Sequence, residues 1–150
     1  MEQFSARFKR MCAEAIEIQR LWPELERPEQ EWDYYCLKGE YKDGFADYRP
    51  LVKLLKGDEK AFFENNIWLP QDFQIVQRLF PRLACGSPPI IENLKTQYSE
   101  YWRTQKAEPF LQNYLNEDER RHARALMFVM ESWFNKEWKE ESQKWVKIPL

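Results

Sequence analysis

The apolar positions of this chain recur mostly at spacings of three and four residues, a pattern that predicts amphipathic helices. Residues 3–22 show it clearly, and Pro23 ends the pattern because a residue that precedes proline resists the helical conformation. The apolar stripe of this segment consists of Phe4, Phe8, Met11, Ala15, Ile18 and Trp22. We therefore expect an N-terminal helix that buries one face.

The longest predicted helix runs from Asn116 to Trp145. Asn116 and Glu119 have the spacing of a capping box, in which each side chain accepts a hydrogen bond from the other residue's N–H. Trp133 lies at the centre of the apolar stripe and is expected to be buried. The stripe comprises Ala123, Leu126, Met130, Trp133, Phe134, Trp138 and Trp145.

Residues 32–48 are the least helical part of the chain. Their aromatic residues favour strands, and Asp43-Gly44 indicates a turn, so both a short β-hairpin and an irregular aromatic loop fit the pattern. Breaks that resemble linkers occur near residues 23–31, 84–89 and 107–109. We predict a mainly α fold, a compact single domain of residues 1–150 built as a bundle of about five helices, with at most one β-hairpin near residues 32–48.

Composition and charge narrow the function classes. Aromatic residues make up 16% of the chain and the net charge is −2, which gives no general attraction to nucleic acid or to acidic membranes. Three scattered cysteines favour reduced thiols over a disulfide framework or a zinc site. No stretch approaches the ~20 apolar residues of a membrane span, and the N-terminus lacks the apolar run of a signal peptide. These features predict a cytoplasmic protein.

The sequence offers little catalytic chemistry. His122 is the only histidine and follows Glu119 at the Glu-x-x-His spacing of di-iron bundles, but such a site needs two of these pairs. No glycine-rich phosphate loop is present among the four glycines. We therefore assign no catalytic residue, no cofactor and no metal ligand, and we interpret His122 as part of a polar helix face.

An enzyme with a carboxylate-based site stays open as the least supported hypothesis, and two hypotheses for binding stand beside it. The first is a non-enzymatic protein-binding module, an adaptor or inhibitor, because tryptophan and tyrosine are frequent at interface hot spots. Its partner could be a second copy of the chain or another protein, and its candidate surface comprises Trp32, Tyr34, Tyr35 and Tyr41. The alternative is a nucleic-acid-associated protein whose candidate contacts are Arg103, Lys106, Arg120, Arg121 and Arg124.

Two segments resemble small proteins of bacteria and their phages. Ile67-Trp68-Leu69-Pro70-Gln71 matches a Trp-Leu-Pro-x-Gln-like helix start, and Ala125-Leu126-Met127-Phe128-Val129-Met130 with Trp145 matches a C-terminal helix that ends in tryptophan. The resemblance covers residues 67–146. The glutamine pattern after Pro70 departs from it, and the predicted C-terminal helix is longer. The resemblance implies no particular activity and favours a phage or mobile-element context.

Overall fold

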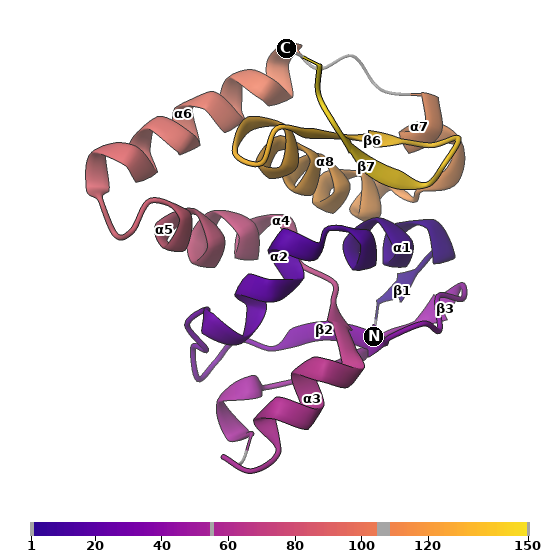
Figure 1. Ribbon diagram of the computed structural model, residues 1–150, viewed down its shortest axis with the longest axis vertical. Helices are drawn as coiled ribbons and strands as arrows, with labels where there is room; N and C mark the ends of the chain where they lie inside the picture. The colour runs from indigo at the N-terminus through magenta and orange to yellow at the C-terminus, as the bar shows by residue number, and fades with distance from the viewer. Residues whose placement is uncertain (1, 55, 105–108, 150) are drawn as a thin grey trace. The chain divides into compact units, whose positions relative to one another are not determined.

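Contacts along the chain divide it into two units, Met1–Pro70 and Gln71–Leu150, which are coloured from indigo to magenta and from magenta to yellow (Figure 1). The boundary after Pro70 coincides with none of the three predicted breaks. The computed structural model describes residues 2–54, 56–104 and 109–149. Within these ranges, no helix is both long enough and apolar enough to cross a membrane.

The first unit mixes short helices with short strands. β4, β2 and β5 form an antiparallel sheet in that order, and β1 pairs separately with β3. In chain order its elements are β1 (Gln3–Phe4), α1 (Ala6–Glu14), α2 (Ile16–Leu21), the 3-10 turn η1 (Trp22–Glu24), β2 (Asp33–Leu37), β3 (Gly44–Phe45), β4 (Asp47–Arg49), the 3-10 turn η2 (Leu51–Lys53), α3 (Glu59–Asn65) and β5 (Asn66–Trp68).

The apolar stripe of residues 3–22 is buried as predicted, although the helix is interrupted. Ser5 begins α1, because its hydroxyl accepts a hydrogen bond from the N–H of Phe8 at 3.1 Å. The helix breaks at Ala15, whose ψ of 68° is not helical, and resumes as α2. The segment therefore keeps one buried face across two helices.

Both faces of the β4-β2-β5 sheet are covered by side chains. Tyr34 and Tyr35 are adjacent in β2, so they point to opposite faces. On one face, the Tyr34 ring contacts Phe4 with the ring centroids 5.3 Å apart. On the other face, the Tyr35 ring contacts Phe62 of α3 at 4.8 Å.

Trp22 lies at the centre of the second face. Its ring is 1% exposed, stacks on Trp68 with the centroids 6.1 Å apart, and meets Phe63 edge-on at 4.9 Å. The indole N–H donates to Oδ2 of Asp33 at 2.9 Å. The polar end of this buried ring is therefore satisfied, as buried tryptophans require.

Gln19 closes the outer edge of β5. Its Nε2 donates to the carbonyl oxygens of Cys12 at 3.0 Å and Trp68 at 2.9 Å, and its Oε1 accepts from the Trp68 N–H at 2.8 Å. An edge strand leaves backbone groups without a neighbouring strand. Here a side chain of α2 takes the place of that strand.

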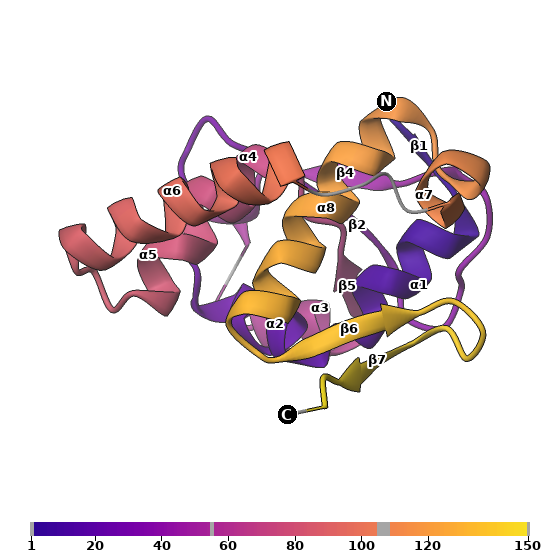
Figure 2. The ribbon, with the colours of Figure 1, turned by 90° about the horizontal axis from the view of Figure 1, so that it is seen from above.

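The second unit consists of helices followed by a β-hairpin. The β6–β7 hairpin follows α8 and contacts it (Figure 2). Phe128 of α8 packs against Phe80 and Tyr98, with the ring centroids 5.9 Å and 5.3 Å apart. Its elements are α4 (Asp72–Gln74), the π-helix η3 (Ile75–Leu79), α5 (Phe80–Leu83), α6 (Pro88–Thr104), α7 (Pro109–Tyr114), α8 (Glu117–Ser132), β6 (Lys136–Lys139) and β7 (Lys144–Lys147).

The predicted start of the C-terminal helix is confirmed. The Glu119 N–H donates to Oδ1 of Asn116 at 2.8 Å, and the Asn116 N–H donates to Oε1 of Glu119 at 3.1 Å. This reciprocal capping box begins α8 at Glu117. A local signal of four residues was sufficient to place this helix start.

The predicted end of that helix at Trp145 is wrong. α8 ends at Ser132, Trp133 is 41% exposed instead of buried, and Asn135 has a left-handed φ of 57°. Trp138 and Trp145 then face each other across the β6–β7 pair, with the ring centroids 5.3 Å apart. A spacing of seven residues suits two helical turns and equally suits this cross-strand pair, which explains the error.

The prediction of a mainly α bundle of about five helices is also wrong. The chain is 54% helical, and its described residues form three small antiparallel sheets as well, so the fold is mixed α/β. Antiparallel pairing occurs in the aromatic segment, where β2 meets β4. That pair belongs to a three-stranded sheet, because β5 joins it from outside the segment.

Candidate functional site

Two of the predicted aromatic residues meet beside β4. The ring of Tyr48 lies 5.0 Å from that of Trp32 and stacks on that of Tyr34 at 4.1 Å, with an interplanar angle of 13°. Trp32 is 43% exposed and Tyr48 is 41% exposed, whereas Tyr34 is buried. We call Trp32, Tyr34, Tyr48 and the strand β4 the aromatic edge.

The other two predicted aromatic residues lie elsewhere. Tyr35 is as buried as Tyr34, but its ring faces Phe62 on the opposite side of the sheet, away from Trp32 and Tyr48. Tyr41 lines a separate cavity of about 450 Å³, together with Arg20 and Lys38. Of the four predicted residues, Trp32 and Tyr34 therefore lie in the aromatic edge, whereas Tyr35 and Tyr41 lie outside it.

The backbone N–H and C=O of Tyr48 lie on the outer edge of β4, the edge that faces away from β2. Along an antiparallel strand, the N–H and C=O groups of successive residues face opposite neighbours. The Tyr34 carbonyl accepts from the Leu69 N–H at 2.9 Å, so the backbone of Tyr34 faces the β5 side. Tyr48 is the cross-strand partner of Tyr34, and its own N–H and C=O therefore point away from β2. Among the described residues, no strand pairs with that edge.

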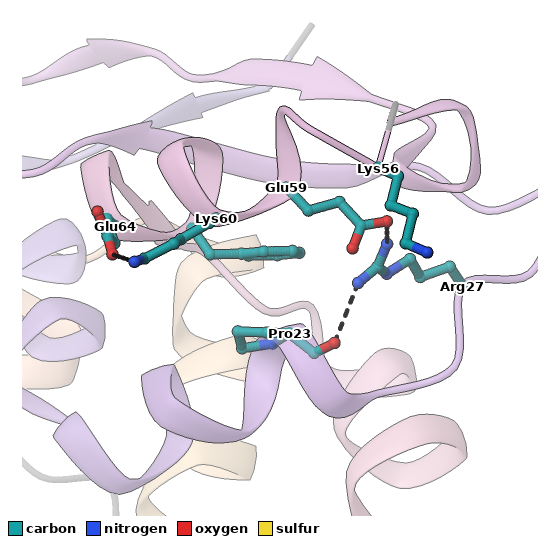
Figure 3. Close-up of a pocket in the computed structure, with 7 residues that line it drawn as sticks. Pro23, Arg27, Lys56, Glu59, Lys60 and Glu64 are labelled. Carbon is teal, nitrogen blue, oxygen red and sulfur yellow. Dashed lines mark hydrogen bonds and ion pairs between the residues drawn. The ribbon is translucent and has the colours of Figure 1, made fainter.

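A cavity of about 420 Å³ lies beside α3 (Figure 3). Arg27 donates to Oε1 of Glu59 at 2.9 Å and to the Pro23 carbonyl at 3.0 Å, and its guanidinium carbon lies 5.1 Å from the centre of the Phe63 ring. These contacts link α3 to η1 through Arg27. The carboxylate of Glu59 balances the positive charge of Arg27. The cavity is lined by Pro23, Arg27, Lys56, Glu59, Lys60, Phe63 and Glu64.

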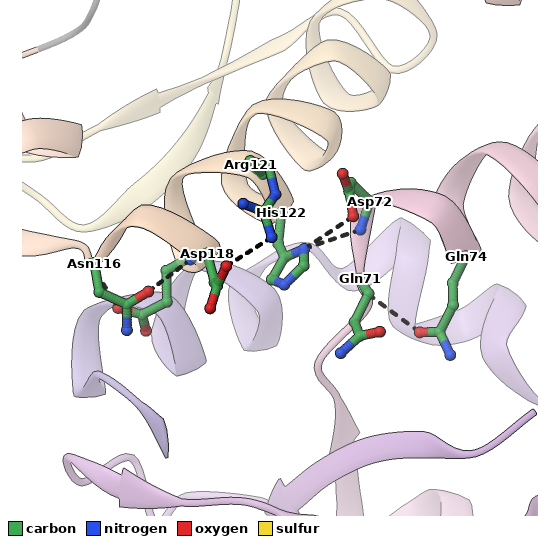
Figure 4. A network of polar contacts seen from close by, with 8 residues as sticks. Gln71, Asp72, Gln74, Asn116, Asp118, Arg121 and His122 are labelled. Atoms are coloured by element: carbon green, nitrogen blue, oxygen red, sulfur yellow. Dashed lines mark hydrogen bonds and ion pairs between the residues drawn. The ribbon is translucent and has the colours of Figure 1, made fainter. Parts of the chain in front are cut away.

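His122 is buried at 4% exposure, so its predicted position on a polar helix face is wrong. Its Nδ1 accepts a hydrogen bond from the Asp72 N–H at 3.0 Å and lies 3.3 Å from Oδ1 of Asp72 (Figure 4). The imidazole thus satisfies an N–H at the start of α4, which lies 50 positions away in sequence. This is a structural role, and no group of three or more potential metal-binding side chains occurs within the described ranges.

The Asp72 carboxyl gives a pH dependence that can be tested. In its protonated form the His122 imidazole instead donates from Nδ1 to Oδ1 of Asp72, and this hydrogen bond lowers the pKa of Asp72; burial opposes the shift, and the Phe73 N–H and the charge of Arg121 lower the pKa further. A lowered pKa means that ionised Asp72 stabilises the fold above the unfolded value of about 3.9, and that this contribution is lost as the pH falls through the folded pKa.

We therefore expect the Asp72→Asn variant to have a flatter pH dependence than the wild type. Between about pH 5 and about pH 2, its free energy of unfolding should fall less, because the titrating carboxyl is gone. Urea titrations at a series of pH values measure the difference. Parallel curves for the two proteins would contradict the assignment.

The predicted basic face is partly occupied by contacts within unit 2. Arg121 donates to Oδ1 of Asp118 at 2.6 Å, and the guanidinium carbon of Arg124 lies 4.8 Å from the centre of the Trp102 ring. Arg103 is exposed and Arg120 is half-buried. The fifth member of the predicted set, Lys106, lies outside the described residues.

The cysteines offer no activated nucleophile at the aromatic edge. Cys12 and Cys36 are buried. Burial raises the pKa of the Cys36 thiol to about 11, with Lys9 opposing the shift, so this thiol stays protonated at neutral pH. It is therefore a weak nucleophile.

Comparison with known proteins adds no assignment to this geometry. No protein family, curated protein or solved structure matches the chain. The functional interpretation therefore depends on the residues themselves.

Proposed function

We propose that this chain is a protein-binding module whose contact surface is the aromatic edge. The observation that carries the proposal is the pair of neighbouring, half-exposed aromatic rings of Trp32 and Tyr48, with centroids 5.0 Å apart, beside a strand edge with outward-facing backbone groups. We propose a role as an adaptor or inhibitor in the cytoplasm, and the sequence resemblance favours a phage or mobile-element context.

The chemistry of the aromatic edge supports binding of a polypeptide. Aromatic side chains contribute large contact areas at interfaces, and tryptophan and tyrosine are frequent among the residues that dominate binding energy. An open strand edge adds backbone hydrogen bonds to an extended partner segment. The combination provides both affinity, from the rings, and orientation, from the backbone.

Replacing Trp32 and Tyr48 together with serine should weaken partner binding by at least about 30-fold, since a hot-spot residue contributes ~2 kcal/mol or more. Both residues are on the surface, so the far-UV circular dichroism should change little. The measurement compares partners captured by tagged wild-type and variant protein in the native host, quantified by mass spectrometry and then by titration with the purified partner.

The matched control replaces Ile16 and Val52 with serine. These residues belong to the same unit and are 49% and 42% exposed, close to the exposed fractions of Trp32 and Tyr48, so the control replaces two apolar side chains of similar exposure. Loss of the same partner from both double variants, or from neither, would contradict the proposal. A folded Trp32/Tyr48 variant that alone loses the partner would support it.

A further inference from the structure

We infer that the aromatic edge binds a second copy of this chain, by antiparallel pairing of β4 with β4 of the other molecule about a two-fold axis at Tyr48. This inference depends on the proposed function, because it names the partner of the same surface. The result would be a continuous six-stranded sheet across two molecules.

The backbone of β4 has the polarity that such pairing needs. The N–H and C=O of Tyr48 point outward, away from β2, because the Tyr34 carbonyl accepts from the Leu69 N–H on the β5 side. Under two-fold symmetry, the N–H of each Tyr48 meets the C=O of the other, which gives a hydrogen-bonded antiparallel pair. Pro50 lacks an N–H and limits the pairing to the short strand.

The charges of β4 are complementary to themselves in this register. With Tyr48 opposite its own copy, Asp47 of each molecule lies opposite Arg49 of the other, and opposite charges across strands attract. Both side chains are exposed; Asp47 lies opposite Tyr35 in the register, and the guanidinium carbon of Arg49 lies 5.6 Å from the centre of the Phe62 ring, which places both on the Tyr35 face. A parallel in-register pairing would set like charges side by side, so the antiparallel register is selected.

The two edges of the sheet differ in a way that favours this partner. Gln19 hydrogen-bonds the N–H and C=O of Trp68 at the edge of β5, whereas β4 presents those of Tyr48 outward. Trp32 lies against Tyr48, and with its symmetry mate it extends the contact beyond the strands. Three paired residues on each side are few against the roughly 20–30 of a stable interface, so the dimer should be weak and reversible.

Sedimentation equilibrium of four proteins tests the inference: the wild type, Asp47→Arg, Arg49→Asp, and the variant that carries both substitutions. Each single reversal places like charges opposite each other at two symmetric positions and should weaken the dimer about 10-fold. The double variant exchanges the charges, restores both attractions, and should dimerise within about threefold of the wild type. Far-UV circular dichroism of each variant confirms the fold.

The outcomes separate this inference from the proposed function. A wild type that remains monomeric at millimolar concentration, or a double variant no tighter than the single ones, overturns the inference. If the Trp32/Tyr48 variant loses a partner that is not a second copy of this chain, the proposed function stands without the inference. If the wild type is monomeric and that variant loses no partner, both fall.

Discussion

Replacing Trp22 with alanine is expected to lower the free energy of unfolding by ~3–5 kcal/mol, the usual cost of truncating a buried tryptophan. Trp22 is 1% exposed, and its ring contacts Trp68 and Phe63. The substitution leaves a cavity between η1, α3 and β5, and it removes the hydrogen bond to Asp33. Urea unfolding followed by circular dichroism measures the loss.

The matched control is Trp133→Ala, the same substitution at a tryptophan that is 41% exposed. A surface position should cost less than about 1 kcal/mol. The helical pattern of the sequence predicts a buried Trp133 and therefore a large loss of stability in the Trp133 variant. The two variants thus also test the sequence prediction against the structure. Similar losses in both variants would contradict the packing described for Trp22.

The second large effect is expected at Gln19, where leucine should cost ~2–4 kcal/mol. Leucine has a similar volume but forms none of the three hydrogen bonds by which Gln19 holds the backbone of Trp68 and Cys12. Each buried polar group that loses its partner costs ~1–3 kcal/mol. Chemical denaturation of the purified variant gives the value.

An exposed glutamine provides the control for that experiment. Gln97 lies on α6, is exposed, and its change to leucine should alter stability by no more than about 0.5 kcal/mol. A Gln19→Leu variant as stable as Gln97→Leu would show that solvent replaces the three hydrogen bonds. The role of Gln19 at the edge of β5 would then be wrong.

Local signals predicted local structure well. The apolar stripe of residues 3–22 and the capping box of Asn116 and Glu119 depend on residues within a few positions of one another, and both are present. The β6–β7 hairpin could not be distinguished from a helix, because Trp138 and Trp145 fit both periodicities. The left-handed conformation of Asn135, which ends the helical path, has no strong signal in the sequence.

The candidate site depends on pairings between distant segments, which a single sequence does not reveal. Trp32 was identified from its aromatic surroundings, but Tyr48 belongs with it only because of the register between β2 and β4. Likewise, Asp72 meets His122 across 50 positions. Knowledge of the register between β2 and β4 would have predicted the contact between Trp32 and Tyr48. Neither that contact nor the one between Asp72 and His122 follows from composition.

The place of β5 in the chain has a consequence for synthesis on the ribosome. Trp68 covers Trp22 and completes the sheet of unit 1, yet it is among the last residues of that unit to be made. At ~5–20 residues per second, translation from one tryptophan to the other takes roughly 2–9 s. During that interval the apolar side chains of Phe4, Phe8 and Met11 lack their completed core. The nascent unit therefore exposes these apolar side chains until β5 has been synthesised.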